Sequence, residues 1–213
     1  GMAEGMRAAG TALINISGKS GVNVGTEKAF DAAGERGIAR FFFVNKLDSD
    51  HADFYKVLTQ LKTEFGPAVC PLVVPFVQDH KVQCYIDVLE YKAFRYENGK
   101  PKPVPLPDMG ERLDGLRTAI YEAVAETSEE AFEKYFSGEA FTPEELIVGL
   151  SSGVRSGSVY PVYCGATQTM DAIDMLLKGL MWMAPTAAQK HAEVTADGEE
   201  IQVSKDGDTA AVV

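Results

Sequence analysis

Short apolar runs alternate with amphipathic stretches along the first third of the chain. Residues 12–16 form one such run, and the Ser-Gly pair after it indicates a strand that stops at a turn. Residues 41–44 are Phe-Phe-Phe-Val, a pattern typical of a parallel strand buried on both faces. Apolar residues at helical spacing follow each run, at Phe30 and Ala33 and then at Phe54, Leu58, Leu61 and Phe65. This rhythm predicts an α/β unit with right-handed crossovers.

The pattern changes after residue 69. Short strand-like segments with short connections fill residues 69–97, which predicts antiparallel pairing. Residues 98–107 are too rich in proline for a helix or a central strand. Two helices are then expected, one capped by Asp108 and one starting at Thr142-Pro143-Glu144-Glu145, where cap, proline and glutamate stand in the favoured order.

Residues 159–164 return to the parallel-strand pattern, and a helix that Pro185 stops follows them. Two Asp-Gly turn signals flank residues 201–203, and residues 210–213 form a strand-like apolar end. The predicted fold class is therefore α/β, a partial parallel sheet with an inserted α+β subdomain and a short β tail. Its expected divisions are residues 1–69 and 158–188 for the α/β domain, 70–157 for the insert and 189–213 for the start of a truncated β domain.

The composition is that of a soluble globular protein, with 213 residues of which 46% are hydrophobic and 24% charged. No apolar run approaches the roughly 18 residues needed to span a bilayer, and the start lacks the features of a secretory signal. A formal net charge of −11 repels phosphate backbones, so we expect no non-specific binding of nucleic acid and a basic protein as the more natural partner.

Cysteine and histidine usage argues against disulfides and metal sites. Cys70, Cys84 and Cys164 are odd in number and form no Cys-x-x-Cys pair, which favours free buried thiols in a reducing cytosol. The three histidines stand at no metal-ligand spacing to one another or to a cysteine. We therefore expect a cytoplasmic protein without a metal site in this chain.

Asn45, Lys46 and Asp48 follow the triple-Phe strand directly and precede a helix. GTPases recognise guanine with this Asn-Lys-x-Asp arrangement: the carboxylate accepts hydrogen bonds from N1–H and the 2-amino group, the lysine stem covers the base and the asparagine braces the loop. The wrong base leaves the carboxylate unpaired, at a cost of about 1–3 kcal/mol. The position also fits, because ligands of open α/β sheets bind at the carboxyl ends of strands.

A motif of three fixed residues matches by chance in about one sequence in thirty of this length. The competing interpretation is therefore a polar strand-to-helix loop in which Asp48 or Ser49 caps the helix. A second loop favours the guanine site. Gly165, Ala166 and Thr167 follow the next predicted parallel strand, where GTPases donate backbone N–H groups to the guanine O6.

Taken together, these features resemble the elongation factor G family of translational GTPases almost end to end. Residues 21–27 match its Gly-Val-x-x-x-Thr-Glu stretch, residues 44–48 and 52–55 its base-recognition loop and following helix, and residues 161–165 the segment before its Gly-Ser-Ala loop. Further matches lie where the family carries its G′ insert, at residues 86–88, 92–93, 133–135 and 142–146. Ala166 and Thr167 depart from the family's Ser and Ala. Ribosomal protection proteins and the class-II release factor are the nearest alternatives.

The resemblance implies a parent protein that binds GTP or GDP with Mg²⁺ and drives translocation on the ribosome. The chain has no Gly-x-x-x-x-Gly-Lys-[Ser/Thr] loop, since Leu13 stands where the first glycine before Gly18-Lys19-Ser20 is required. A magnesium-binding Asp-x-x-Gly motif in the right context is also missing. We therefore expect no catalytic residue in this chain, no GTPase activity from it alone and guanine binding on the order of millimolar or weaker.

Two expectations concern partners. Glu122, Glu126 and Glu129 begin an acidic cluster with Glu130 and Glu133, which is either a solvated helix face or a surface for the basic ribosomal stalk protein that the family's insert binds. The chain would then be an interaction module without enzymology of its own. The strand at residues 13–16 is expected at an exposed sheet edge, which is a template for self-association.

Overall fold

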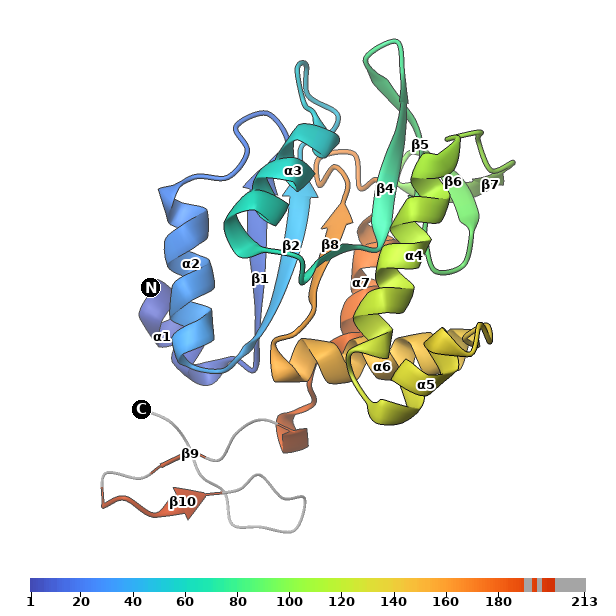
Figure 1. Ribbon diagram of the computed structural model, residues 1–213. Coiled ribbons are helices and arrows are strands. Elements are labelled where there is room, and N and C mark those ends of the chain that lie inside the picture. Colours follow the sequence, from blue (N-terminus) through green and yellow to red (C-terminus); the bar gives the residue numbers. More distant parts are fainter. Residues whose placement is uncertain (190–192, 195–196, 202–213) are drawn as a thin grey trace.

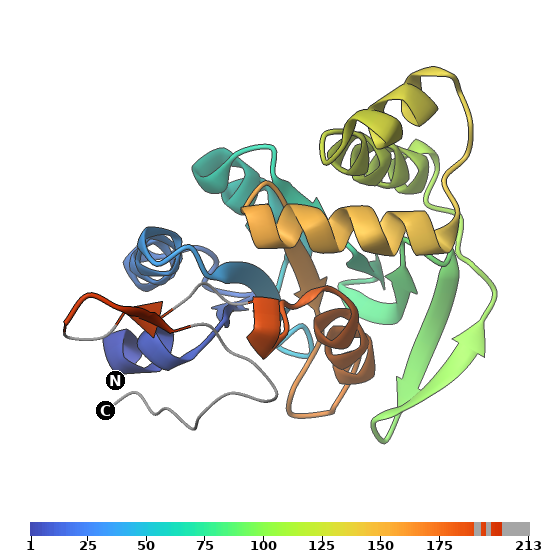
Figure 2. The ribbon, with the colours of Figure 1, turned by 90° about the horizontal axis from the view of Figure 1, so that it is seen from below.

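The computed structural model describes residues 1–189, 193–194 and 197–201. Its centre is a parallel sheet in the order β1-β2-β8-β3, formed by β1 (Thr11–Ser17), β2 (Ala39–Asn45), β8 (Tyr160–Cys164) and β3 (Val69–Pro71) (Figure 1). The helices α2 (Val24–Glu35) and α3 (Phe54–Phe65) cover one face, and α7 (Ile173–Met183) lies on the other (Figure 2). The predicted α/β class is confirmed.

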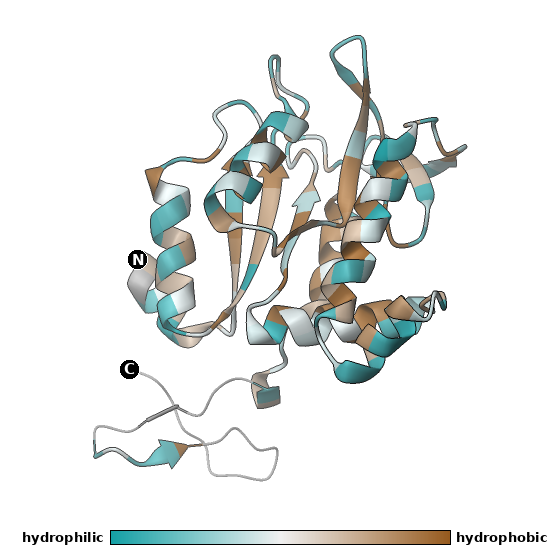
Figure 3. Cartoon of the chain, in the orientation of Figure 1, coloured by the Kyte–Doolittle hydropathy of each residue, from teal (hydrophilic) through white to brown (hydrophobic). Residues whose placement is uncertain are grey.

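The triple-Phe segment is buried as predicted. Phe41, Phe42 and Phe43 are all buried, because β2 lies between β1 and β8 and both of its faces are covered. Phe42 stacks on Phe30 of α2 and Phe65 of α3, with ring centroids 5.8 and 5.2 Å apart. Figure 3 shows the strongly hydrophobic course of this strand. The position of β2 is thus fixed by aromatic packing on the α2–α3 side.

A second, antiparallel sheet in the order β4-β5-β6-β7 stands beside the parallel one. Its strands are β4 (Val73–Gln78), β5 (Lys81–Asp87), β6 (Lys92–Glu97) and β7 (Lys100–Val104). The proline-rich segment forms β7, an edge strand, the position in a sheet at which prolines are best tolerated. The helices α4 (Glu111–Ala125), α5 (Glu129–Phe136) and α6 (Pro143–Ser156) then lead back to β8.

Two local predictions are wrong. The start of the segment predicted as antiparallel, residues 69–71, is β3, which pairs in parallel with β8. Asp108 does not cap α4: the N-cap is Gly110, and the Asp108 carboxylate accepts a hydrogen bond from the Gly110 N–H at 2.8 Å. The start of α6 is as predicted, with Thr142 and Glu145 forming a capping box around Pro143. The domain boundaries remain predictions.

The two ends of the chain add short elements. A helix that the pattern did not predict, α1 (Met2–Ala8), precedes β1, and a 3₁₀ turn η1 (Ala187–Gln189) follows α7. The strands β9 (Glu193–Val194) and β10 (Glu200–Ile201) pair antiparallel around the first Asp-Gly turn. The second turn signal and the apolar segment 210–213 lie outside the described residues. In the described part of the chain, no helix is long and apolar enough to cross a bilayer.

Candidate functional site

Two loops start side by side at the carboxyl edge of the parallel sheet. The first, residues 46–53, leaves β2, and the second, residues 165–172, leaves β8. Because Val44 pairs with Cys164 in the sheet register, the loops begin at the same level. The topology therefore brings the two predicted guanine-recognition segments together although they lie far apart in sequence.

Asn45 joins the two loops through its side chain. Its Oδ1 accepts hydrogen bonds from the backbone N–H groups of Lys46 at 2.7 Å and Thr167 at 3.0 Å. Its Nδ2 donates to Thr167 Oγ1 at 3.1 Å. The residue is only 5% exposed, and a buried amide with these partners is costly to replace. Asn45 therefore acts as a brace and does not face solvent.

Backbone hydrogen bonds complete this junction. The Gly165 N–H donates to the Val44 carbonyl at 3.0 Å, and the Leu47 N–H donates to the Gly165 carbonyl at 3.2 Å. The loop after β1 joins them, since the Gly18 N–H donates to the Asn45 carbonyl at 2.8 Å. Three loops of one sheet edge are thus held in fixed relative positions.

Lys46 and Asp48 differ from Asn45 in being exposed. Within the described residues, neither side chain has a hydrogen-bond or ion-pair partner. Both line an open depression of about 580 Å³ with Ser17, Lys19, Ser20, Ser49 and Asp50. The backbone of Lys46 adopts φ 62°, a left-handed conformation that is unfavourable for a lysine and that its N–H bond to Asn45 helps to hold. A free carboxylate and a free ammonium are therefore presented to one depression.

In the second loop, the backbone donors already have acceptors. The N–H of Ala166 donates to the Asp171 carbonyl at 3.1 Å, and the reverse bond from the Asp171 N–H measures 3.0 Å, so these residues form a short antiparallel bridge. The Thr167 N–H donates to Asn45 Oδ1. A base carbonyl placed here would have to share or replace one of these acceptors. As residues, Thr167 is exposed whereas Ala166 is buried.

Sequence patterns did not reveal the role of Asp171. Its bridge to Ala166 uses backbone atoms only, which leave no side-chain signature. Burial raises the pKa of the Asp171 carboxyl, and the negative charge of Asp48 raises it further. The two carboxylates are therefore electrostatic neighbours, one on each loop. Burial also raises the pKa of Tyr85 in β5, and the negative charges of Asp171 and Asp48 raise it further.

The three cysteines are free and buried, as predicted. Burial raises the pKa of the Cys70 thiol to about 12 and that of Cys164 well above its usual range, which leaves both as unreactive thiols. The Cys164 Sγ donates to the Val73 carbonyl at 3.3 Å. Among the described residues, no group of three His, Cys, Asp or Glu side chains could hold a metal ion.

The acidic cluster lies away from the loops. Glu122 belongs to α4, Glu126 is the C-cap of that helix and Glu129 begins α5, and all three are exposed. Glu122 accepts a hydrogen bond from the Tyr135 hydroxyl at 3.3 Å. In Figure 1, α5 is at the end of the molecule opposite the carboxyl edge of the parallel sheet. The structure therefore separates the two candidate sites that the sequence suggests.

Comparison with known proteins identifies the family to which this architecture belongs. Residues 1–186 match the family described as the elongation factor Tu GTP binding domain. The chain belongs to this family. It is 31% identical over 190 residues to an elongation factor G-like protein of Thermotoga maritima, a match that covers 88% of this chain and 27% of that protein. The resemblance to elongation factor G-like GTPases is thereby confirmed.

A solved structure shares the fold of this chain. A crystal structure of a protein from Thermus thermophilus superposes with a TM-score of 0.82 at 34% identity. The match covers 88% of this chain and 28% of that protein. The chain thus spans about a quarter of the length of the proteins it matches, so activities of such whole proteins enter below only as proposals.

Proposed function

We propose that this chain recognises the guanine base of GTP or GDP within a cytoplasmic, ribosome-associated translational GTPase resembling elongation factor G. The proposal rests on a difference in burial and hydrogen bonding within the Asn-Lys-x-Asp motif of residues 45–48. Asn45 is buried and hydrogen-bonds to both loops, whereas Lys46 and Asp48 are exposed and without partners among the described residues. A loop whose only role was to cap the next helix would not need a buried asparagine next to an exposed lysine and aspartate, because Asp53 already caps α3.

The chemistry follows from these free groups. The Asp48 carboxylate is an acceptor-only group that suits the adjacent N1–H and 2-amino donors of guanine. The aliphatic stem of Lys46 offers an apolar surface to one face of the base. The Thr167 N–H, which belongs to the exposed residue of the pair, is the proposed donor for O6. Adenine presents no such donor pair, so specificity arises from leaving Asp48 unpaired with the wrong base.

Phosphate binding and hydrolysis are proposed to need residues outside these 213. The sequence holds no phosphate-binding loop, and the described residues hold no set of metal ligands. Contacts to phosphates and Mg²⁺ supply most of the charge stabilisation in phosphoryl transfer. We therefore propose weak binding, on the order of millimolar, and no GTP turnover by the isolated chain.

The test is an NMR titration of the 213-residue chain with GDP and ADP, repeated with Asp48→Asn and with Asp50→Asn. Asp50 lines the same depression, so its variant makes the same charge change beside the proposed base contact. Asp48→Asn should weaken GDP binding about 10-fold or more and improve binding of xanthosine diphosphate, which offers an acceptor to the new amide. Equal losses in both variants, or equal binding of GDP and ADP by the wild type, would contradict the proposal.

A second candidate function is docking of a basic partner on the insert, such as the ribosomal stalk protein. None of the residues of α5 is buried, and Phe132 and Phe136 are 50% and 70% exposed beside Glu129. The two rings contact each other, with centroids 4.4 Å apart. Apolar area flanked by acidic side chains suits a Lys-rich surface. Charge reversal at Glu122 and Glu126 should slow association with that partner and flatten its salt dependence; an unchanged rate would remove this candidate.

A further inference from the structure

The second loop contains backbone conformations that need external support. Met170 and Ala172 adopt φ values of 62° and 59°, in the left-handed region that costs a non-glycine residue about 1 kcal/mol or more. Ala172 is also the N-cap of α7, and it provides no side-chain hydrogen bond to the first turn. Such a segment persists only where its surroundings hold it in place.

The hairpin between β6 and β7 provides a tight contact. Glu97 pairs with Lys100, so Asn98 and Gly99 form a two-residue turn, and their positive φ values of 52° and 72° are those of a type I′ turn. A Cβ atom on Gly99 would lie 2.9 Å from the Met170 Cβ and 3.4 Å from the Thr169 carbonyl oxygen. The turn backbone therefore lies against the second loop with no room for a side chain between them.

A hydrogen bond from the same hairpin fixes the start of α7. The Tyr96 hydroxyl donates to Asp174 Oδ1 at 2.5 Å, a charge-assisted contact to the first turn of the helix that follows the loop. Burial raises the pKa of Tyr96, and its bond to Asp174 raises it further, so the phenol keeps its proton. Tyr96 is itself held by an edge-to-face contact with the buried Tyr85, at 5.8 Å between ring centroids.

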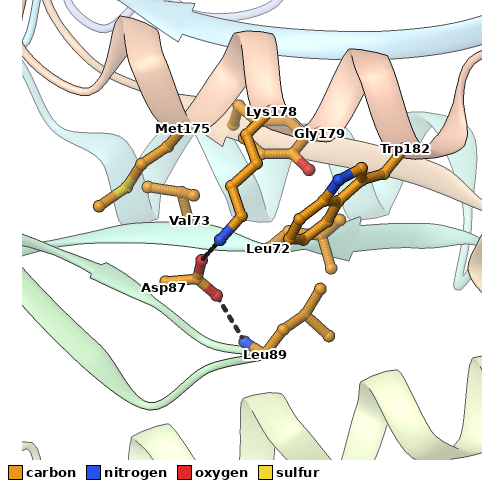
Figure 4. A pocket seen from close by; sticks show the side chains of 9 residues that line it. Leu72, Val73, Asp87, Leu89, Met175, Lys178, Gly179 and Trp182 are labelled. Carbon is orange, nitrogen blue, oxygen red and sulfur yellow. Dashed lines mark hydrogen bonds and ion pairs between the residues drawn. The ribbon is translucent and has the colours of Figure 1, made fainter. Parts of the chain in front are cut away.

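A second tie links the insert to α7 about one helical turn after Asp174. Lys178 forms ion pairs with Glu90 and, at 3.8 Å, with Asp87, and its ammonium lies 4.4 Å from the Trp182 ring centroid. Figure 4 shows Lys178 reaching from α7 toward Asp87 beside Trp182. The enclosed space here is only about 10 Å³, which holds at most one water, so this region is a contact and not a ligand site.

We propose that the β6–β7 hairpin of the insert positions the guanine-binding loop 165–172, with Tyr96 as the positioning residue. The expected effect on nucleotide binding rests on the proposed function. The positioning of the loop by the hairpin does not depend on that function. The Tyr96 hydroxyl bonds to Asp174, and through it acts on the strained segment that precedes α7. The insert thereby sets the position of the Thr167 N–H, the donor proposed for O6.

The experiment compares Tyr96→Phe with a matched control in the full chain. Tyr91 donates a hydrogen bond of the same kind, at 2.6 Å to Asp114 of α4, a helix that contributes to neither loop. Tyr96→Phe should speed amide exchange in residues 165–172 and weaken GDP binding about 3- to 10-fold, whereas Tyr91→Phe should change neither. The loss should be smaller for 2-aminopurine riboside diphosphate, which lacks O6, because general destabilisation would affect both ligands equally.

Variants at the partner residue make the test robust to poor folding of Tyr96→Phe. Asp174→Ala should reproduce its effects, the double variant should be no worse than either single one, and Asp174→Asn, which keeps an acceptor oxygen, should retain most of the binding. Equal exchange in Tyr96→Phe, Tyr91→Phe and wild type would overturn the positioning role. Faster exchange in Tyr96→Phe, combined with a wild type that binds no GDP, would instead support positioning and remove the proposed base recognition.

Discussion

The two loops of the candidate site present recognition groups in opposite ways. In the first loop, the side chains of Lys46 and Asp48 are free in the described structure and exposed, and a buried asparagine holds the backbone. In the second loop, the backbone itself is expected to contact the base, yet the N–H groups of Ala166 and Thr167 already have protein acceptors. The first loop offers a ligand two side chains that have no protein partner in the described structure. The second loop offers backbone groups that neighbouring residues hold in place.

This difference predicts which substitutions each loop tolerates. Substitution of an exposed side chain in the first loop should change ligand recognition without changing the stability of the fold. Adding one methyl group at Gly165 in the second loop should destabilise the fold, because the atom nearest to it would be the Asp171 carbonyl oxygen.

The largest effect is expected from Gly165→Ala. A Cβ there would lie 2.3 Å from the Asp171 carbonyl oxygen and 3.3 Å from the Phe43 ring, and backbone cannot move aside as a side-chain end can. We expect a loss of about 1–3 kcal/mol in the free energy of unfolding and weaker GDP binding. Chemical denaturation with a parallel titration measures both.

Gly115→Ala is the matched control for this substitution. Gly115 lies in α4 with no atom within 4 Å of an added Cβ, so the change should stabilise the chain by up to about 1 kcal/mol. If both variants kept wild-type stability and binding, the second loop would not be the tightly packed member of the pair.

Asn45→Ala should have the next largest effect, since it removes the bonds that join the loops. The Lys46 and Thr167 N–H groups would lose their acceptor, for a cost of about 2 kcal/mol, and GDP binding should fall because both loops are released. Asn23→Ala, which removes the cap of α2, should cost about 1 kcal/mol and leave GDP binding unchanged. Equal binding losses would show that stability alone explains the effect of Asn45→Ala.

The smallest effect concerns the helix after the first loop. Tyr55 in α3 donates to the Pro75 carbonyl at 2.9 Å, and burial raises its pKa from 10.0 to about 12. Between these values the unfolded chain releases a proton that the folded chain keeps, so the free energy of unfolding falls as pH rises through this window. Allowing for partial exposure, we expect a decline of about 1–2 kcal/mol.

The measurement is denaturant unfolding at about pH 9, 10, 11 and 12 for wild type and Tyr55→Phe, a range that brackets the tyrosine pKa values. The variant should be less stable at the lowest pH, because the Pro75 carbonyl loses its donor, but its stability should fall less steeply as the pH rises. Identical slopes would show that the alkaline loss comes from other groups, such as Tyr96 beside the second loop.

Side-chain patterns could predict the first loop and its strand but only part of the second. The apolar run at residues 41–44 marks a central strand because burial on both faces requires it. The bridge between Ala166 and Asp171 uses only backbone atoms, so no residue type indicates it. The pairing of β3 was predicted wrongly because so short a strand carries no periodicity, and its partner, β8, lies beyond the whole insert in the sequence.

The bond between Asn45 and Thr167 closes a span of 122 residues, which has a consequence for how the molecule folds. Contacts of such separation form late, since the entropy of closing a long loop opposes them until intervening structure shortens the path. Local hairpins and helices of the insert can form first and bring the strand β8 beside β2. We therefore expect the capacity to bind a base to be acquired at the end of folding. A chain with a misfolded insert should then lack the recognition site, even with every residue of the motif intact.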